Sequence, residues 1–538
     1  MRWLRHACAS LVLLTLVCSG LSAASPAPDF RLRDWLGHDW QREPVTFSLT
    51  AAQARQAKSG QALRGANGTA IPYQLIYGAT AHDLRIAFQT DLPAYAVREF
   101  RLAPGTANRT TDLRIVETAD AVELTNAQTG IRLAKTLAAD RGPISAVRLP
   151  SGAWVGGSRV ITKTPVTAYA VKILARGPVY AEVVCQAAFG PTATWSLRIR
   201  LYAGEPVVLI DEASAIDGPA VTFSLDLQRQ LNPDTLLYRS GMSTGETYYG
   251  RNCTWTLAPG EVYRLEPWLR WQESMRQGNY FGLYHDGSDD LLAVAAREAG
   301  AWVDPSVPAE KRAWHRQSVQ CDAQGVHLDF PLKVCRRKWM YMTLPAEPCL
   351  VEARDPKPNA ASPLPYRYLI KYGHFPLDMV KEYVLEWDAS AETHPRMLIT
   401  KPMLERYLAP MQGHPYSMEK ALQYARECIH VFLNQGGLPY GSAPHMQSRV
   451  VIEALMFADT ALRDGEGTPE ERQRLRAQLA FVGYAISRPE YWSPERGYAG
   501  TANMTTMVAA YRLAAGSLLS SHPRAADWRK AGMTELVR

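Results

Sequence analysis

Long hydrophobic runs, cysteine pairs and a strong excess of either charge are all lacking in this 538-residue sequence. Lys and Arg number 59 against 52 Asp and Glu, and no basic run lies behind the net charge of +7, which argues against dedicated nucleic-acid binding. No stretch is long enough to span a bilayer, so stable membrane insertion is not expected. The 47% hydrophobic and 21% charged content excludes disorder, collagen and coiled coil as the main architecture.

Cysteine is sparse and unpaired in sequence. None of the eight cysteines belongs to a Cys-x-x-Cys motif, so zinc and thioredoxin-like chemistry are poorly supported. Those that follow residue 24 can form incidental disulfides in an oxidising compartment or remain buried free thiols. They are Cys185, Cys253, Cys321, Cys335, Cys349 and Cys428.

Residues 1–24 have the pattern of a secretory signal peptide. Arg2 and Arg5 precede a short apolar run, and small residues precede a cleavage point after Ala24. We therefore expect a secreted or periplasmic protein. Cys18 raises lipoprotein anchoring as the less favoured alternative.

Two kinds of periodicity divide the rest of the chain. Alternating segments such as Val45–Leu49 and Leu84–Phe88, with the turn dipeptide Asn67-Gly68 between them, predict strands up to about residue 350. After residue 400 the apolar spacing becomes helical, and Thr468–Glu471 is a capping box with Pro at the first helical position. The predicted fold class is therefore multidomain β + α.

The predicted domain order has four parts after the signal peptide. We expect an N-terminal β barrel-like domain over 29–112 and a central β-sandwich over 113–350. A Pro-rich connector follows over 351–395, and paired helices occupy 396–538.

Short motifs resemble those of polysaccharide lyases. His394–Thr400 resembles the start of the helical domain in heparinase II/III-like lyases, whereas Ala175–Val183 and Cys335–Tyr341 are similar to the sandwich of exo-acting rhamnogalacturonan lyases. The resemblance implies that the helices form a C-terminal α/α toroid. That toroid is expected to be incomplete, because the sequence stops at Arg538 inside a helical pattern. It also implies β-elimination on a uronic-acid polysaccharide, hence an acidic polysaccharide or oligosaccharide as substrate.

β-Elimination requires a donor to the uronate carboxylate, a base for the adjacent proton and an acid for the leaving oxygen. One Gly- and Pro-rich loop supplies Tyr440 and His445 as candidate catalytic residues, with Asn434 and Arg449 as substrate contacts. The alternative is that these polar groups cap helices or, for Arg449, carry a surface charge.

A second loop supplies Tyr498 as a further catalytic candidate. From the resemblance, the role of contacting the carboxylate is carried to Asn503, which otherwise serves as a helix N-terminal residue. In the β half, Trp268 and Trp271 are candidates for stacking on sugar rings, or belong with Tyr280 to a buried aromatic cluster.

Three other features of the sequence leave alternatives open. Tyr372 and His374 could line a cleft or pack between domains. Asp286, Asp289 and Asp290 suggest structural calcium or a plain acidic turn, and no other cofactor is implied.

Two other functions remain open. A glycoside hydrolase would need two carboxyls across the sugar, for which Glu490 and Glu495 are the obvious pair. A non-catalytic glycan-binding protein is the third possibility.

Overall fold

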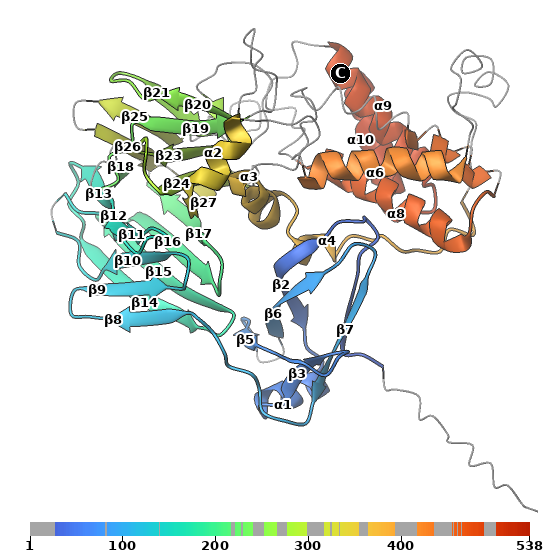
Figure 1. Cartoon of the computed structure of the whole chain (residues 1–538), viewed down its shortest axis with the longest axis horizontal. Helices are drawn as coiled ribbons and strands as arrows, with labels where there is room; N and C mark the ends of the chain where they lie inside the picture. Colours follow the sequence, from blue (N-terminus) through green and yellow to red (C-terminus); the bar gives the residue numbers. More distant parts are fainter. Residues whose placement is uncertain are drawn as a thin grey trace, which may run out of the picture.

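The computed structural model comprises a small N-terminal β domain, a large β-sandwich, a connector and a group of helices (Figure 1). The described residues lie within 27–537. Gaps in this description fall at 81–82, 139, 217–220, 228–229, 240–251, 266–276, 299–316, 323–324, 333, 355–363, 393–416, 435–453, 456, 460, 464 and 489–501.

The N-terminal domain contains two antiparallel sheets, in the orders β1-β7-β3-β4 and β2-β6-β5. The rings of Phe30, Phe47, Phe88 and Phe100 pack across the two sheets, with centroid separations from 4.8 to 6.4 Å. Side-chain packing, and not hydrogen bonding between strands, thus joins the two sheets. The described strands therefore do not form the expected barrel. The elements are β1 (Phe30–Arg33), β2 (Trp40–Ser48), α1 (Ala51–Lys58), β3 (Ala62–Gly65), β4 (Ala70–Ile71), β5 (Tyr73–Tyr77), β6 (Leu84–Leu92) and β7 (Val97–Ala103).

The sandwich places a nine-stranded sheet opposite a five-stranded and a six-stranded sheet. The large sheet has the order β14 (Ala168–Arg176), β15 (Tyr180–Phe189), β16 (Ala193–Tyr202), β17 (Val207–Ala215), β27 (Cys335–Pro345), β24 (Asp290–Arg297), β23 (Tyr280–Tyr284), β19 (Thr235–Arg239) and β20 (Asn252–Thr256). The five-stranded sheet contains β12 (Trp154–Val155), β11 (Ile144–Arg148), β10 (Gly130–Ala134), β9 (Ala121–Thr125) and β8 (Arg114–Glu117). The six-stranded sheet contains β13 (Gly157–Thr162), β18 (Val221–Asp226), β26 (Gly325–Leu332), β25 (Gln317–Asp322), β21 (Val262–Leu265) and β22 (Gln277–Gly278).

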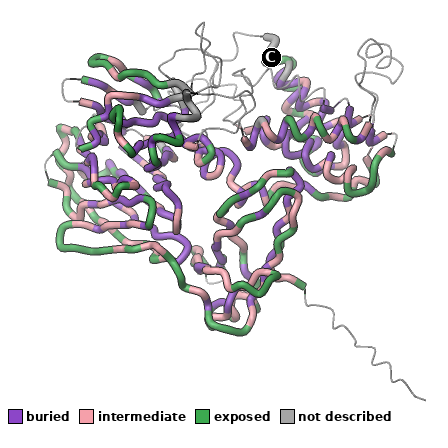
Figure 2. Tube along the Cα trace, viewed as in Figure 1, coloured by how far each residue is buried: buried purple, intermediate pink, exposed green. Residues whose placement is uncertain are grey.

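Alternation along the strands builds the sandwich core. On β16, Leu197 and Ile199 are buried and pack in one cluster with Phe223 and Leu328 of the six-stranded sheet, while Arg198 between them is exposed. Figure 2 shows buried stretches in the interior of the sandwich and exposed positions along its outer loops. The predicted strands in this region are confirmed as β15, β16 and β17.

A buried ion pair lies inside the sandwich core. Arg337 on β27 and Glu212 on β17 are cross-strand partners, and both side chains are 0% exposed. Two parallel bonds of 2.9 and 2.7 Å join them, and the indole of Trp195 donates to the same carboxylate at 3.0 Å. This bidentate geometry offsets the desolvation cost of both ions. Removal of one partner would leave the other as a buried charge without a counter-ion.

The connector contains α2 (Ala346–Arg354), α3 (Leu364–Leu369), the π-helix η3 (Ile370–His374) and α4 (Leu377–Val380). The helices that follow are α6 (Met418–Asn434), α8 (Pro469–Ile486), α9 (Ala502–Leu518) and α10 (Ala525–Val537), with α6 packed on α8, α8 on α9 and α9 on α10. The predicted capping box is confirmed, since Thr468 accepts from the Glu471 backbone and the Glu471 carboxylate accepts from Thr468. The described helices form a run of neighbours and do not display the expected ring.

The predicted thiols and packing residues can also be placed. Four cysteines are free and buried, which confirms the thiol alternative for them: Cys185, Cys321, Cys349 and Cys428. Tyr280, Tyr372 and His374 are buried, in agreement with packing roles. Asp290 accepts from Ser151, and the described residues contain no group of three or more side chains arranged to hold a metal.

The N-terminal domain, the sandwich and the connector meet at Lys371 of η3. Its ammonium donates to the Gln41 carbonyl at 2.9 Å and to the Glu205 carboxylate at 3.0 Å, so it links the N-terminal domain to the sandwich. Glu43 lies buried at the same junction and accepts from the Leu377 backbone at 3.3 Å. Burial raises the pKa of Glu43 to about 8; Lys371 opposes this rise, and the nearby Glu205 charge adds to it.

Breaking the buried pair should destabilise the sandwich. We expect Glu212→Ala to lower the free energy of unfolding by about 3–5 kcal/mol, because Arg337 keeps its charge without a partner. The double variant Glu212→Leu/Arg337→Met removes both charges and should cost less, about 1–3 kcal/mol, because only the Trp195 indole loses its acceptor. Urea unfolding of the three proteins checks this, and an equally large loss in the double variant would contradict it.

The junction should respond to pH through Glu43. Its folded pKa of about 8 lies above the usual 4.5, so the unfolded chain gives up this proton first. The free energy of unfolding should therefore fall as pH rises through this window, and Glu43→Gln should remove that part of the fall. Urea midpoints at several pH values measure it, with the exposed Glu386→Gln as control. Equal pH slopes for Glu43→Gln and wild type would refute the assignment.

Candidate functional site

The predicted site residues divide into described and undescribed positions. Asn434 is the last residue of α6, and Asn503 lies in the first turn of α9, where its side chain is outside the described residues. The remaining candidates also lie outside the described residues: Tyr440, His445, Arg449, Tyr498, Trp268 and Trp271, together with Glu490 and Glu495 of the hydrolase alternative.

Asn434 contacts a histidine one helical turn earlier. Its amide nitrogen lies 2.8 Å from Nδ1 of His430, and both side chains are partly buried. Because the amide nitrogen can only donate, Nδ1 accepts, and the proton of a neutral His430 ring then resides on Nε2. The Asn434 amide therefore orients the His430 ring at the end of α6.

A loop of the N-terminal domain carries a second histidine, His38, whose pKa is influenced by His430. The buried Asp34 carboxylate shapes the loop, and Gly37 adopts a φ of +72°. A Cβ at Gly37 would lie 2.4 Å from the Tyr95 hydroxyl, so only glycine fits there. Asp34 accepts from the backbone N–H of Leu36 (3.2 Å), Gly37 (2.7 Å) and Tyr95 (2.8 Å) and from the indole of Trp40 (3.0 Å).

The environment of His38 keeps its ring neutral. The ring packs edge-on against Trp40 with centroids 4.5 Å apart. Burial lowers the pKa of His38 from 6.5 to about 4; Asp39 opposes this shift, and His430 adds to it. His38 and His430 therefore lie within electrostatic range of one another. An imidazole with so low a pKa stays uncharged at neutral pH.

Contacts with α8 hold the loop of His38 against the helices. Gln478 donates to the Trp35 carbonyl at 3.5 Å, and Arg33 forms an ion pair with Glu470 at 3.8 Å. The guanidinium of Arg474 covers the Tyr95 ring at 4.3 Å. The approach of His38 to His430 is thus part of a wider contact between the two domains.

This group of side chains can bind a polar substrate and move protons. A neutral imidazole offers one donor and one acceptor, and an amide can donate to a carboxylate. Titratable groups with shifted pKa values at a domain contact are a usual feature of active sites. The group of His38, His430 and Asn434 is therefore the candidate site in the described part of the chain.

Sequence reasoning found Asn434 but missed both histidines. The spacing of His430 and Asn434 at i and i+4 on one helical face was a readable signal, since such residues are neighbours. His38 carried no comparable signal, because its partner lies near the other end of the chain.

Comparisons with known proteins yield distant structural likenesses only. No protein-family model and no curated protein matches the chain. An α-mannosidase of Enterococcus faecalis matches with 8% identity over 59% of this chain and 43% of its own length, at a TM-score of 0.35. A galactose mutarotase-related enzyme of Lactobacillus acidophilus matches with 8% identity over 43% of this chain and 97% of its own, at a TM-score of 0.24. The chain spans less than half of the mannosidase. Within the described residues, no helix has both the length and the apolarity needed to cross a membrane.

The neutral state of His38 predicts an acid-sensitive fold. Its folded pKa of about 4 lies below the usual 6.5, so between these values the unfolded chain binds more protons. The contribution of His38 to the free energy of unfolding should be complete above pH 6.5 and be lost as pH drops toward 4, and His38→Gln should remove that part of the fall. Urea unfolding of the wild type and of His38→Gln at several pH values tests this. An unchanged slope in His38→Gln would contradict a neutral His38.

Proposed function

We propose that the protein is a secreted carbohydrate-active enzyme, a polysaccharide lyase that cleaves a uronic-acid glycan by β-elimination. The observation that carries this proposal is the group of His38, His430 and Asn434, drawn from two domains. β-Elimination needs neutral proton-transfer groups and a carboxylate donor, and imidazole and amide side chains supply both. In this proposal Tyr440, His445 and Tyr498 complete the catalytic set.

Among the described residues, the carboxylates near the candidate site fit hydrolysis less well. A glycoside hydrolase needs one carboxyl as acid and a second as base or nucleophile, with the sugar between them. Both carboxylate oxygens of Asp34 accept hydrogen bonds from the loop that carries His38 and from Tyr95. Asp39 is exposed and accepts from Gln41 at 3.1 Å. Hydrolysis is therefore kept as the alternative outcome of the experiment.

The products distinguish the functions. Incubation with pectic, alginate and glycosaminoglycan substrates should yield an unsaturated uronate that absorbs in the near ultraviolet. Reducing ends without that chromophore would show a hydrolase and overturn the lyase proposal. Binding without either product would show a non-catalytic glycan-binding protein.

Substitution of the site residues should reduce turnover without unfolding the protein. We expect His430→Ala and His38→Gln each to lower kcat/KM by about 10²–10⁴-fold, the usual contribution of a positioned acid or base. Tyr440→Phe and His445→Ala should abolish turnover. Circular dichroism at neutral pH controls for folding, and His285→Gln serves as the matched histidine control. Near-normal rates would remove the substituted residue from the mechanism.

A further inference from the structure

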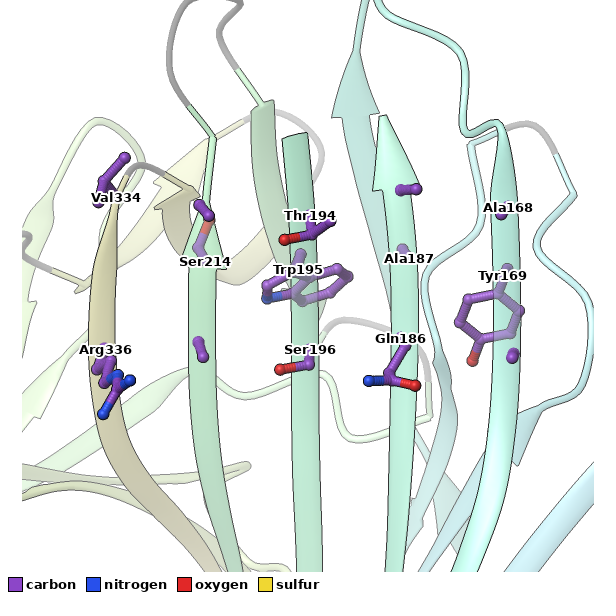
Figure 3. Close-up of a pocket in the computed structure, with 14 residues that line it drawn as sticks. Ala168, Tyr169, Gln186, Ala187, Thr194, Trp195, Ser196, Ser214, Val334 and Arg336 are labelled. Carbon is purple, nitrogen blue, oxygen red and sulfur yellow. The ribbon is translucent and has the colours of Figure 1, made fainter. Parts of the chain in front are cut away.

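One face of the nine-stranded sheet is hollowed at the end formed by β14 to β17 and β27. A pocket of about 640 Å³ opens there, lined from all five of these strands (Figure 3). The strands face solvent at this end, since Ala170, Gln186, Thr194 and Arg336 are exposed. The volume lies within the usual range for small-molecule sites, and it suits a ligand of a few sugar rings.

Alanines on a single face of the sheet form much of the pocket floor, with Thr194 and Ser196 of β16 between them. Register aligns Ala168 with Ala188, and Ala170 with Gln186, and the same rows continue to Ala215 and Ala213. Alanine is depleted in strands, where larger branched side chains pack better on a pleated surface. Five alanines on one open face therefore call for a cause other than strand stability, and a flat apolar floor is what the carbon face of a sugar ring requires.

One of the two rows that contain these alanines also contains polar side chains. Gln186, Ser196 and Arg336 lie in a single row across the sheet, and Figure 3 shows them at the same height. Gln and Ser can exchange hydrogen bonds with sugar hydroxyls, and an Arg guanidinium can bind a carboxylate with two parallel bonds.

The next row of the same face contains four basic side chains and one acidic one. Two residues farther along each strand, the aligned positions are Lys172, Val184, Arg198, Asp211, Lys338 and Arg297. Asp211 is neutralised by Arg297 at 2.7 Å, while Lys338 contacts Glu298 at 2.6 Å and Arg198 contacts Glu182 at 3.4 Å. Lys172 and Arg336 add exposed positive charge on either side. The surroundings of the pocket are thus complementary to an anion.

We infer that this pocket is a second glycan-binding site, which holds a uronate-bearing oligosaccharide with its ring on the alanine floor and its carboxylate on Arg336. The site lies on the sandwich, separate from the His38–His430 group on the N-terminal and helical domains. It would hold a distant segment of the same polymer and raise the effective concentration of substrate at the other site. The choice of ligand rests on the proposed function.

Binding of a defined oligosaccharide tests the inference. Calorimetric titration of the full chain with an oligogalacturonate should show affinity that falls as salt rises, and a neutral galactan oligomer of equal length should bind far more weakly. Arg336→Ala should lower the oligogalacturonate affinity about tenfold, because a charged hydrogen bond is lost. Ala170→Trp should lower it as well by filling the pocket. The matched control is Arg55→Ala on α1, which should leave the affinity unchanged.

Turnover separates this inference from the proposed function. Arg336→Ala should raise KM for long polymers and leave kcat/KM for the shortest cleaved substrate unchanged. Unchanged affinity in both Arg336→Ala and Ala170→Trp would overturn the inference, even for an active lyase. Equal binding of the neutral oligomer would likewise overturn it. An inactive protein with Arg336-dependent oligogalacturonate binding would overturn the proposed function and support the pocket.

Discussion

The Lys371 ammonium, held between the Gln41 carbonyl and the Glu205 carboxylate, joins three parts of the molecule. Gln41 belongs to the N-terminal domain, Glu205 to the sandwich, and Lys371 to the connector that leads to the helices. Glu205 is buried and the Lys371 side chain is only 11% exposed, so their ion pair is costly to desolvate unless its partners are in place, whereas the Gln41 end of the contact is exposed. The contacts of Lys371 therefore specify one arrangement of the domains. At the same junction, the ring of Tyr202 stacks on that of Tyr372 with centroids 5.7 Å apart.

That arrangement has a functional consequence. With the N-terminal domain fixed at the connector, the loop shaped by Asp34 rests on α8 and places His38 within electrostatic range of His430. The candidate site thus belongs to no single domain. It depends on the same contacts that orient the N-terminal sheets, so the site and the domain assembly should be gained or lost together.

Features that depend on residues close in sequence could be predicted, whereas contacts between residues far apart in sequence could not. The capping box at Thr468 and Glu471 fixed the start of α8, since it depends only on residues three apart. Alternation likewise predicted the strands that the structure places in β2 and β6. The predicted barrel does not form, because the two N-terminal sheets are joined by the packed rings of Phe30, Phe47, Phe88 and Phe100 and not by hydrogen bonds between strands. The pairing of His38 with His430 depends on tertiary contacts that no local pattern encodes.

The central claim is that His38 is a neutral imidazole in a substrate-binding site shared by two domains. The most direct measurement is a pH titration by NMR of the protein labelled at its histidine rings, with His38→Gln to assign the resonance. The account predicts an apparent pKa of about 4 for His38, together with a resonance shift when a uronate oligosaccharide is added. A titration near the ordinary value of 6.5, with no response to the oligosaccharide, would contradict it.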